Sequence, residues 1–194
     1  MEAEARRRDI VQAAIESLAH SGVEGLRVRA VANEVGINHA TLLHYFPTKA
    51  ALIKGAALEI ARRFAAPMPD RGRTLTPVEE LRWEFDDALR RVVQESQELR
   101  ALVDLMLRAS GDPALAALLD GIFGGWRRQL GALVRRGAAA GDFRSDVDPG
   151  AAADAIIGLI QGIALEAISG MPKERVGAAM ETAELAAERL LTRN

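Results

Sequence analysis

Apolar residues recur at intervals of three and four along almost the whole chain, and this periodicity restricts what the sequence can fold into. Such spacing places apolar side chains on one face of an α-helix, because the helix turns once every ~3.6 residues. Stretches of alternating apolar and polar residues, the pattern of a half-buried strand, are nearly absent. The sequence therefore predicts an all-α protein.

Residues that start and stop helices divide this periodicity into nine predicted helices. Three short helices are expected in residues 5–46, with stops at Ser21-Gly22, Gly36 and Pro47. Thr48 can cap a fourth, from residue 49 to about 66, ahead of a linker at 67–73. The later helices open on a capping box and on further cap or proline signals, namely Thr76-Pro77-Val78-Glu79, Ser96, Asp112-Pro113, Asp148-Pro149 and Pro172.

Composition narrows the class of protein. A hydrophobic share of 49% with 27% charged residues is ordinary for a globular protein. We expect no apolar run of membrane-spanning length, no signal core in the charged first eight residues, and therefore a cytoplasmic protein without a membrane partner. The absence of cysteine excludes disulfides, thiolate metal sites and cysteine nucleophiles. The net charge is −2, yet residues 5–55 carry seven Lys/Arg against four Asp/Glu, a local bias toward a polyanion.

Residues 28–46 have the pattern of two helices joined by a tight turn. Gly36 tolerates the positive φ that the corner requires, and Ile37 can anchor the turn in the core. Asn38 can accept a hydrogen bond from the N–H groups that open the next helix. That helix is too short to be stable alone, so its presence must serve a contact with something outside the helix. In a helix-turn-helix the second helix lies in the major groove of DNA.

From Ile10 to Leu52 the chain resembles the N-terminal domain of the TetR family of transcriptional regulators. The residues in register with that family are Ala32, Gly36, Thr41, Leu42, Tyr45, Phe46, Lys49 and Leu52. The resemblance implies a DNA-binding domain at residues 1–48 and a ligand-binding and dimerisation domain at 49–194. It also implies a homodimeric regulator, a repressor, that leaves a palindromic double-stranded DNA operator when a small-molecule effector enters the second domain. No cofactor is expected.

The resemblance further implies which side chains contact DNA. Arg29 can reach a guanine edge or a phosphate, and the charge of Lys49 suits a phosphate at the start of the fourth helix. Two positions depart from the family: Leu43 replaces a tyrosine that meets the phosphate backbone, and Arg27 replaces a capping threonine and is interpreted as a substitute phosphate contact. The predicted DNA-binding residues are Arg27, Arg29, Asn38, His39, Ala40, Thr41, Leu43, His44, Tyr45 and Lys49.

Two other features of the first segment have alternative interpretations. His39 and His44 are five residues apart, about 140° around a helix axis, so they do not share a face and no metal site is expected. His20 is expected to be exposed near the end of the first helix. Residues 6–8, three consecutive arginines, are either a DNA-contacting arm or a solvated helix start.

The family resemblance implies a ligand cavity in the second domain, although aromatic residues at helical spacing more often form core. Gln161 is a specific candidate, because an amide within an apolar helix needs a hydrogen-bond partner if it is buried, and an interhelical hydrogen bond is the alternative. The predicted lining residues are Trp83, Met106, Phe123, Trp126 and Gln161.

Small residues near the C-terminus allow helices to approach closely. They are spaced along the last two predicted helices, at Ala155, Gly158, Gly162, Ala179, Ala183 and Ala187. The resemblance implies that these helices form a four-helix dimer interface with a second copy, and ordinary packing within the chain is the alternative. Gly141-Asp142-Phe143-Arg144, ahead of them, is similar to the corresponding stretch of many family members.

Two other classes of function fit less well. An enzyme would need a nucleophile, a base and an orienting group brought together, or a metal site, and the sequence offers neither. A helical adaptor that binds proteins would not need an arginine, two histidines and a lysine around so short a helix. The helix from residue 49 joins the two domains and is therefore the expected lever between effector and DNA, with a coupling of roughly 1–3 kcal/mol.

Overall fold

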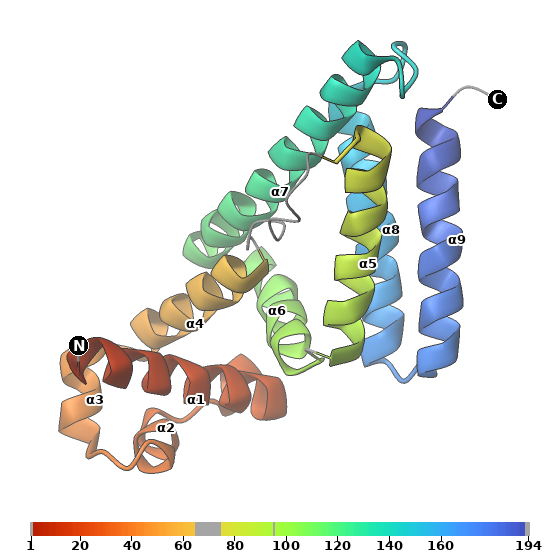
Figure 1. Ribbon diagram of the computed structural model, residues 1–194. Coiled ribbons are helices and arrows are strands. Elements are labelled where there is room, and N and C mark those ends of the chain that lie inside the picture. Colours follow the sequence, from red (N-terminus) through yellow and green to blue (C-terminus); the bar gives the residue numbers. More distant parts are fainter. Residues whose placement is uncertain (1, 65–74, 95, 193–194) are drawn as a thin grey trace. The chain divides into compact units, whose positions relative to one another are not determined.

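The computed structural model describes residues 2–64, 75–94 and 96–192 and contains only helices and their connections within these ranges (Figure 1). The prediction of an all-α protein is confirmed. The helices of the described residues are α1 (Glu2–Gly25), α2 (Val28–Glu34), α3 (His39–Tyr45), α4 (Lys49–Phe64), α5 (Pro77–Gln94), α6 (Ser96–Arg108), a 3₁₀ turn η1 (Ala109–Gly111), α7 (Pro113–Ala140), α8 (Pro149–Ile168) and α9 (Lys173–Leu191).

The predicted helix caps are formed. Five side chains accept a hydrogen bond from a backbone N–H in the first turn of the helix that follows, at 2.7–3.3 Å. They are Asn38, Thr48, Thr76, Asp112 and Asp148. Each cap satisfies a donor that the helix itself leaves unpaired, so these residues set where the helices begin. The predicted linker at 67–73 and the side chain of Ser96 lie outside the described parts of the chain.

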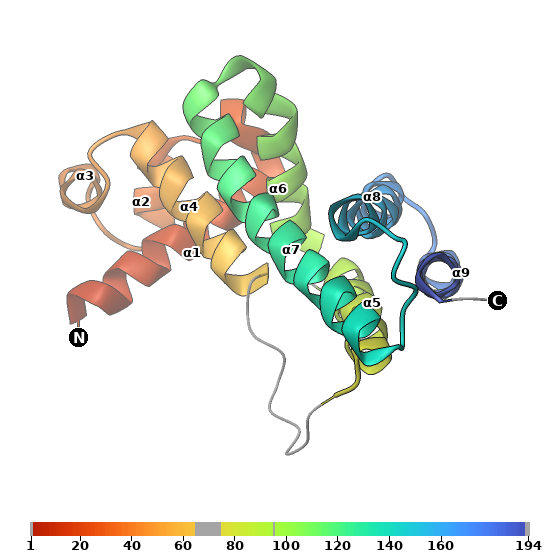
Figure 2. The same ribbon diagram turned by 90° about the horizontal axis from the view of Figure 1, so that it is seen from above.

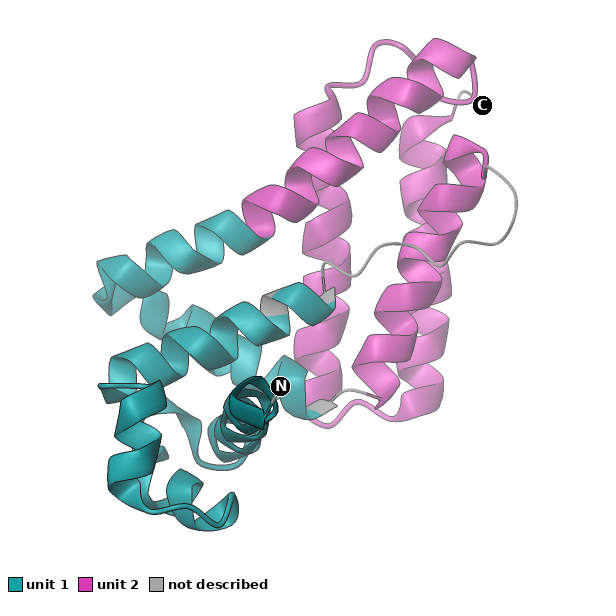
Figure 3. Ribbon diagram, turned by 60° about the vertical axis from the view of Figure 1, so that its left-hand side comes forward, with its two compact units in different colours: residues 1–66, 97–122 teal, residues 67–96, 123–194 magenta. Residues whose placement is uncertain are grey.

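The chain forms two compact units, coloured separately in Figure 3. The first unit comprises residues 1–66 and 97–122. Here α1 packs against α4 and α2, and α2 packs against α3. The core consists of fully buried apolar side chains, among them Ile10, Ile15, Leu18, Leu42, Leu52 and Ile60. Burial of one such side chain contributes about 1.5–3 kcal/mol, so tertiary packing stabilises even the short α3.

The second unit comprises residues 67–96 and 123–194. Within it α5, α8 and α9 pack against one another, and Figure 2 shows α8 and α9 nearly end-on and side by side. Its core includes Phe85, Leu130 and Ile156, none more than 1% exposed. The boundary between the units runs through α7, whose residues 113–122 belong to the first unit (Figure 3). The functional division at residue 48 stays a prediction.

α8 contradicts one expectation. The sequence was expected to hold no apolar stretch of membrane-spanning length, but α8 has 20 residues with a mean hydropathy of 1.6 and qualifies by length and composition. Only 33% of this apolar stretch is buried within the protein. Leu159 and Leu165 of α8 are 38% and 52% exposed. The helix therefore presents an apolar side that the described part of this chain leaves uncovered.

Candidate DNA interface and effector site

The turn between α2 and α3 has the predicted geometry. Gly36 adopts a φ of 71°, in the left-handed region that favours glycine. The Ile37 N–H donates to the carbonyl of Ala32 at 2.9 Å, which closes the turn. Asn38 then caps α3 by accepting from the Thr41 N–H at 2.8 Å. The two helices are thus joined by a fixed corner, as a helix-turn-helix requires.

The short helix α3 has one buried side and one open side. Leu42 is fully buried in the core of the first unit. Ala40 and His44 lie one turn apart and are both exposed, while His39, Thr41 and Leu43 are partly exposed. Of the predicted DNA-contacting residues of α3, Ala40 and His44 therefore lie on the side that the first unit leaves open, and the others, Tyr45 included, are partly covered.

The end of α3 is held by neighbouring helices of the same unit. Phe46, which follows α3, is buried, and the guanidinium of Arg7 from α1 lies 4.8 Å from its ring centroid. A Cβ atom on Gly55 of α4 would lie only 2.6 Å from the same ring, so α4 approaches Phe46 closely. The ring of Tyr45 stands edge-on to His44, with centroids 5.9 Å apart. These contacts fix how α3 is presented.

Three cations lie beside this helix pair and differ in their partners. Arg29 is exposed, and its guanidinium forms no hydrogen bond or ion pair with another side chain or backbone group of the described residues. The guanidinium of Arg27 donates to the backbone carbonyl of Glu24, and Lys49 Nζ lies 3.4 Å from the same oxygen. Arg27 and Lys49 thus converge on the end of α1. Their predicted phosphate contacts, like that of Arg29, stay predictions.

The histidines do not assemble with acidic residues. His20 is exposed at the surface of α1, as expected. Across the described ranges, no three His, Asp or Glu side chains are grouped in a way that would hold a metal ion.

In the second unit, the structure pairs one predicted effector residue with a residue that sequence reasoning missed. The indole N–H of Trp126 on α7 donates to the Glu84 carboxylate on α5 at 2.6 Å, and both side chains are only partly exposed. Glu84 follows the buried Leu81 by three residues and precedes the buried Ala88 by four. That helical spacing, which places a carboxylate beside an apolar face, is the signal that could have found it.

The electrostatic surroundings of Glu84 are unusual for this unit. Burial raises the pKa of its carboxyl, and the hydrogen bond from Trp126 and the charge of Arg91 only partly offset that effect. Other acids of the unit are paired with arginine: Asp87 with Arg91 at 2.6 Å, and Glu188 with Arg82 at 2.6 Å. No lysine or arginine of the described residues forms an ion pair with Glu84. Its negative charge is therefore partly desolvated, and it is offset only in part, by Arg91 on the same helix, which forms its ion pair with Asp87.

Within the described residues, none of the other predicted lining residues is hydrogen-bonded to Glu84 or Trp126. Trp83, Phe123 and Gln161 are partly exposed in the second unit, and Met106 is partly exposed in the first. The amide of Gln161 forms no hydrogen bond within the described residues, so the interhelical hydrogen bond considered for it is absent there.

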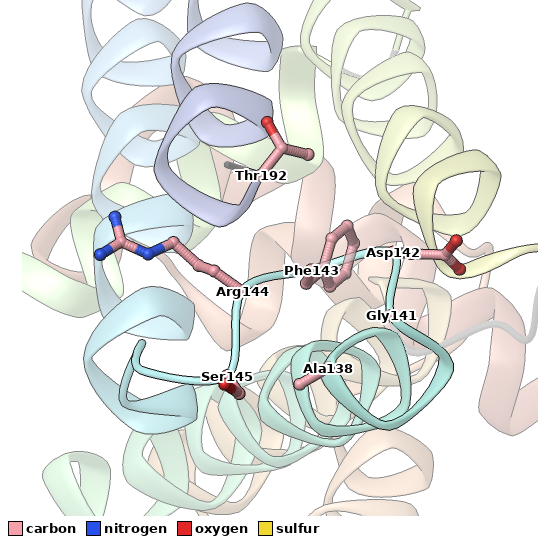
Figure 4. Close-up of a pocket in the computed structure, with 7 residues that line it drawn as sticks. All are labelled: Ala138, Gly141, Asp142, Phe143, Arg144, Ser145 and Thr192. Carbon is pink, nitrogen blue, oxygen red and sulfur yellow. The ribbon is translucent and has the colours of Figure 1, made fainter. Parts of the chain in front are cut away.

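A cavity of about 400 Å³ lies elsewhere in the second unit, at the connection between α7 and α8 (Figure 4). It is lined by Ala138, Gly141, Asp142, Phe143, Arg144, Ser145 and Thr192. Arg144 is held by the Asp146 carboxylate at 2.6 and 2.7 Å, and its backbone N–H donates to Leu191 at 2.7 Å. Phe143 is buried. The stretch Gly141-Asp142-Phe143-Arg144 thus joins the end of α7 to the end of α9, and none of the predicted lining residues lies here.

Comparison with known families accounts for most of the chain. Residues 10–56 match the family model of bacterial regulatory proteins of the tetR family. Residues 77–192 match the C-terminal model of BetI-type transcriptional repressors. The chain belongs to the TetR family of transcriptional regulators. Members of this family are DNA-binding transcriptional repressors that dimerise and bind small-molecule ligands, and they are not enzymes.

Individual relatives agree with this assignment. Tetracycline repressor proteins of class D from Escherichia coli and class H from Photobacterium damsela subsp. piscicida are each 37% identical over 57 residues. This alignment covers 29% of the chain and 26% of each repressor, so it spans about a quarter of the relatives' length.

Solved structures share the fold over nearly the full chain. A TetR-family regulator from Rhodococcus sp. has a TM-score of 0.82 at 20% identity, covering 97% of this chain and 100% of that one. GusR from Salmonella enterica has a TM-score of 0.82 at 22% identity, with 98% and 97% covered. A transcriptional regulator from Saccharomonospora viridis, in complex with choline, has a TM-score of 0.76 at 19% identity, with 99% and 100% covered.

Proposed function

We propose that this protein is a cytoplasmic repressor that binds a palindromic DNA operator as a homodimer and leaves it when a small molecule binds the second unit. The observation that carries the DNA-binding part is the open side of α3, where Ala40 and His44 are exposed, together with the exposed Arg29 on α2, the helix that packs against α3. Because α3 is capped at its start and held at its end, its exposed side chains form a rigid surface that suits a DNA groove.

The DNA interface is tested with an operator selected from random duplex DNA by the wild-type protein. We expect an Arg29→Ala, His44→Ala variant to lose at least about tenfold in operator affinity, since one good base contact discriminates by roughly 1–3 kcal/mol. The matched control is His20→Ala, Arg128→Ala, which removes the same residue types from exposed positions outside α2, α3 and the proposed dimer interface. Wild-type affinity in the first variant would refute the assignment.

The homodimer is supported by the uncovered apolar side of α8. Gly158 and Gly162 of α8 are exposed, which lets another helix approach closely, and Leu165 stands out beside them at 52% exposure. On α9, Leu185 is 53% exposed. A second copy that covers these helices would form a symmetric four-helix interface. The two α3 helices of such a dimer would contact half-sites about 34–36 Å apart or a multiple of that spacing.

Sedimentation measures the oligomeric state directly. Leu165→Glu places a charge within the proposed interface and is expected to yield monomers. Leu58→Glu is the control, because Leu58 is 48% exposed but belongs to α4 in the first unit. If the Leu165→Glu variant remained dimeric, the proposed interface would be wrong.

For the effector, the pair Glu84 and Trp126 supports an organic cation. A desolvated carboxylate without a contacting cation attracts a positive charge, and an indole face can stabilise a quaternary ammonium group. The fold neighbour from Saccharomonospora viridis holds such a molecule, choline. An alternative neutral effector would leave the Glu84 charge unneutralised.

Choline and its uncharged analogue 3,3-dimethylbutanol separate these two kinds of effector. We expect choline to lower the operator affinity of the wild-type protein and of Asp86→Asn, an exposed carboxylate on the same helix. We expect no effect of choline on Glu84→Gln and none of the neutral analogue on any protein. Equal release by both compounds, or release of Glu84→Gln by choline, would contradict a cationic effector.

A further inference from the structure

Helix α1 is interrupted near its end, and the interruption frees a backbone donor. The sequence predicts a stop at Ser21-Gly22, but the helix resumes after Gly22, whose φ of 67° and ψ of 179° are not helical, and continues to Gly25. Because of this break, the Val23 N–H lies outside the ladder of helical hydrogen bonds. It donates instead to the carboxylate of Asp104, on α6, at 2.7 Å.

A second residue of α6 contacts the same corner. Arg108 follows Asp104 by one helical turn, and its guanidinium donates to the Glu24 carboxylate at 2.6 Å. The Arg108 Nε also lies 3.4 Å from the Asp104 carboxylate. Helix α6 thus places a carboxylate against the N–H of Val23 and a guanidinium against the carboxylate of Glu24. Because Glu24 is 81% exposed, the ion pair contributes less than the hydrogen bond.

The corner that α6 contacts, residues 22–27, also leads directly into the DNA-binding helices. The backbone carbonyl of Glu24 accepts from Arg27, within the corner, and from Lys49, so α4 contacts the corner as well. Arg27 is the last residue before α2, and Arg29 is the second residue of that helix. The position of the corner therefore determines where α2 begins.

The other end of α6 is attached to α1 as well. Arg63 of α4 donates to Glu98 of α6 at 2.7 Å and to Gln12 of α1 at 2.8 Å. All of these residues belong to the first compact unit. Glu98 and Asp104 are six residues apart, about 9 Å along the helix axis, so α6 is attached to α1 near both of its ends.

We infer that Asp104 and Arg108 of α6 are positioning residues for operator binding. They hold the corner of residues 22–27 in the arrangement in which Arg27, Arg29 and α3 together fit one half-site. This inference rests on the proposed DNA-binding function. It assigns a role in DNA binding to two side chains that follow the predicted DNA-binding domain by more than fifty residues in the chain.

The test compares affinity for the selected operator with affinity for a random duplex of the same length. Asp104→Ala leaves the Val23 N–H without its acceptor, and we expect operator affinity to fall about tenfold while random-duplex affinity stays unchanged, because phosphate contacts carry non-specific binding. Asp104→Asn keeps an oxygen acceptor but loses the charge, and we expect a smaller loss, of about threefold. For Arg108→Ala we expect about threefold.

Arg100→Ala is the matched control, since Arg100 is an exposed arginine of the same helix and should change neither affinity. Thermal melting checks that each variant is folded, and Asp104→Asn with Arg108→Ala decides the matter if Asp104→Ala does not fold. Equal losses on both duplexes, unchanged operator affinity in folded variants, or tighter operator binding would each overturn the inference. A wild-type protein that selects no operator would refute the proposed function as well.

Discussion

Glu59 in the first unit and Glu84 in the second meet opposite surroundings. Glu59 accepts hydrogen bonds from Arg62 and Arg63, and these bonds lower its pKa to about 2. Glu84 accepts one from an indole, and burial raises its pKa. An acid of the first kind stabilises the fold by its charge, whereas an acid of the second kind is tolerated at a cost. The charge of Glu59 is thus paired with cations of the same chain, whereas that of Glu84 is only partly offset, which agrees with the proposed cationic ligand.

Among substitutions in the two units, loss of the Phe46 ring should have the largest effect on stability and on operator binding. Phe46 is 2% exposed in the first unit, and we expect Phe46→Ala to lower the free energy of unfolding by about 3–5 kcal/mol. Because this ring also fixes the end of α3, operator binding should be lost in whatever fraction stays folded. Denaturant unfolding together with operator titration measures both. Phe85→Ala, in the core of the second unit, should be equally destabilising, and a fully folded, operator-binding Phe46→Ala variant would contradict this role.

Removal of the Glu84 charge should stabilise the protein. The pKa of Glu84 is raised above its ordinary value of 4.5 in the folded chain, so its ionisation destabilises the folded state as the pH rises through 4.5 and beyond. We expect Glu84→Gln to increase the free energy of unfolding by about 1 kcal/mol at pH 7. The gain should vanish below pH 4.5. Unfolding of both proteins at equal concentration over a pH series measures it, and a destabilised variant at pH 7 would show that Glu84 is a structural residue.

Removal of a helix cap should separate stability from DNA binding. Asn38 and Asp148 each cap a helix in the same way, one in each unit, and replacing either by alanine should cost about 1 kcal/mol of stability. Only Asn38→Ala should weaken operator binding, because only Asn38 opens α3. Similar operator affinities for the two variants, measured where both are folded, would mean that the start of α3 does not matter for DNA.

The smallest effect is expected at Glu59. Its folded pKa of about 2 lies below its ordinary value of 4.5, so its stabilising contribution is present above pH 4.5 and disappears as the pH falls toward 2. Since the pairs are close to solvent, we expect Glu59→Gln to cost about 0.5 kcal/mol at pH 7. Melting temperatures of variant and wild type should converge at low pH. If the difference in melting temperature grew on acidification, the Glu59 charge would not stabilise the folded protein as proposed, and Glu59 would no longer differ from Glu84 in this respect.

Much of the architecture followed from signals that lie close together in the sequence. The helical periodicity, the turn at Gly36 and the caps at Asn38, Asp112 and Asp148 involve residues within a few positions of each other. The stop at Gly22 was only half right, because the backbone does leave the helical conformation there but the helix resumes. The apolar length of α8 is not apparent from the sequence, because its two acidic residues, Asp154 and Glu166, interrupt a run that remains apolar on average.

The sequence by itself determined the all-α fold and the helix-turn-helix segment, because local hydrogen bonds and helical spacing specify both, and the resemblance of that segment to known regulators pointed to the family. Only the tertiary structure decided which distant groups meet. Glu84 and Trp126 are 42 residues apart, and Val23 and Asp104 are 81 apart. Whether a carboxylate pairs with an arginine, an indole or a free backbone N–H depends on which helix faces lie against each other. The periodicity along one helix does not contain that information.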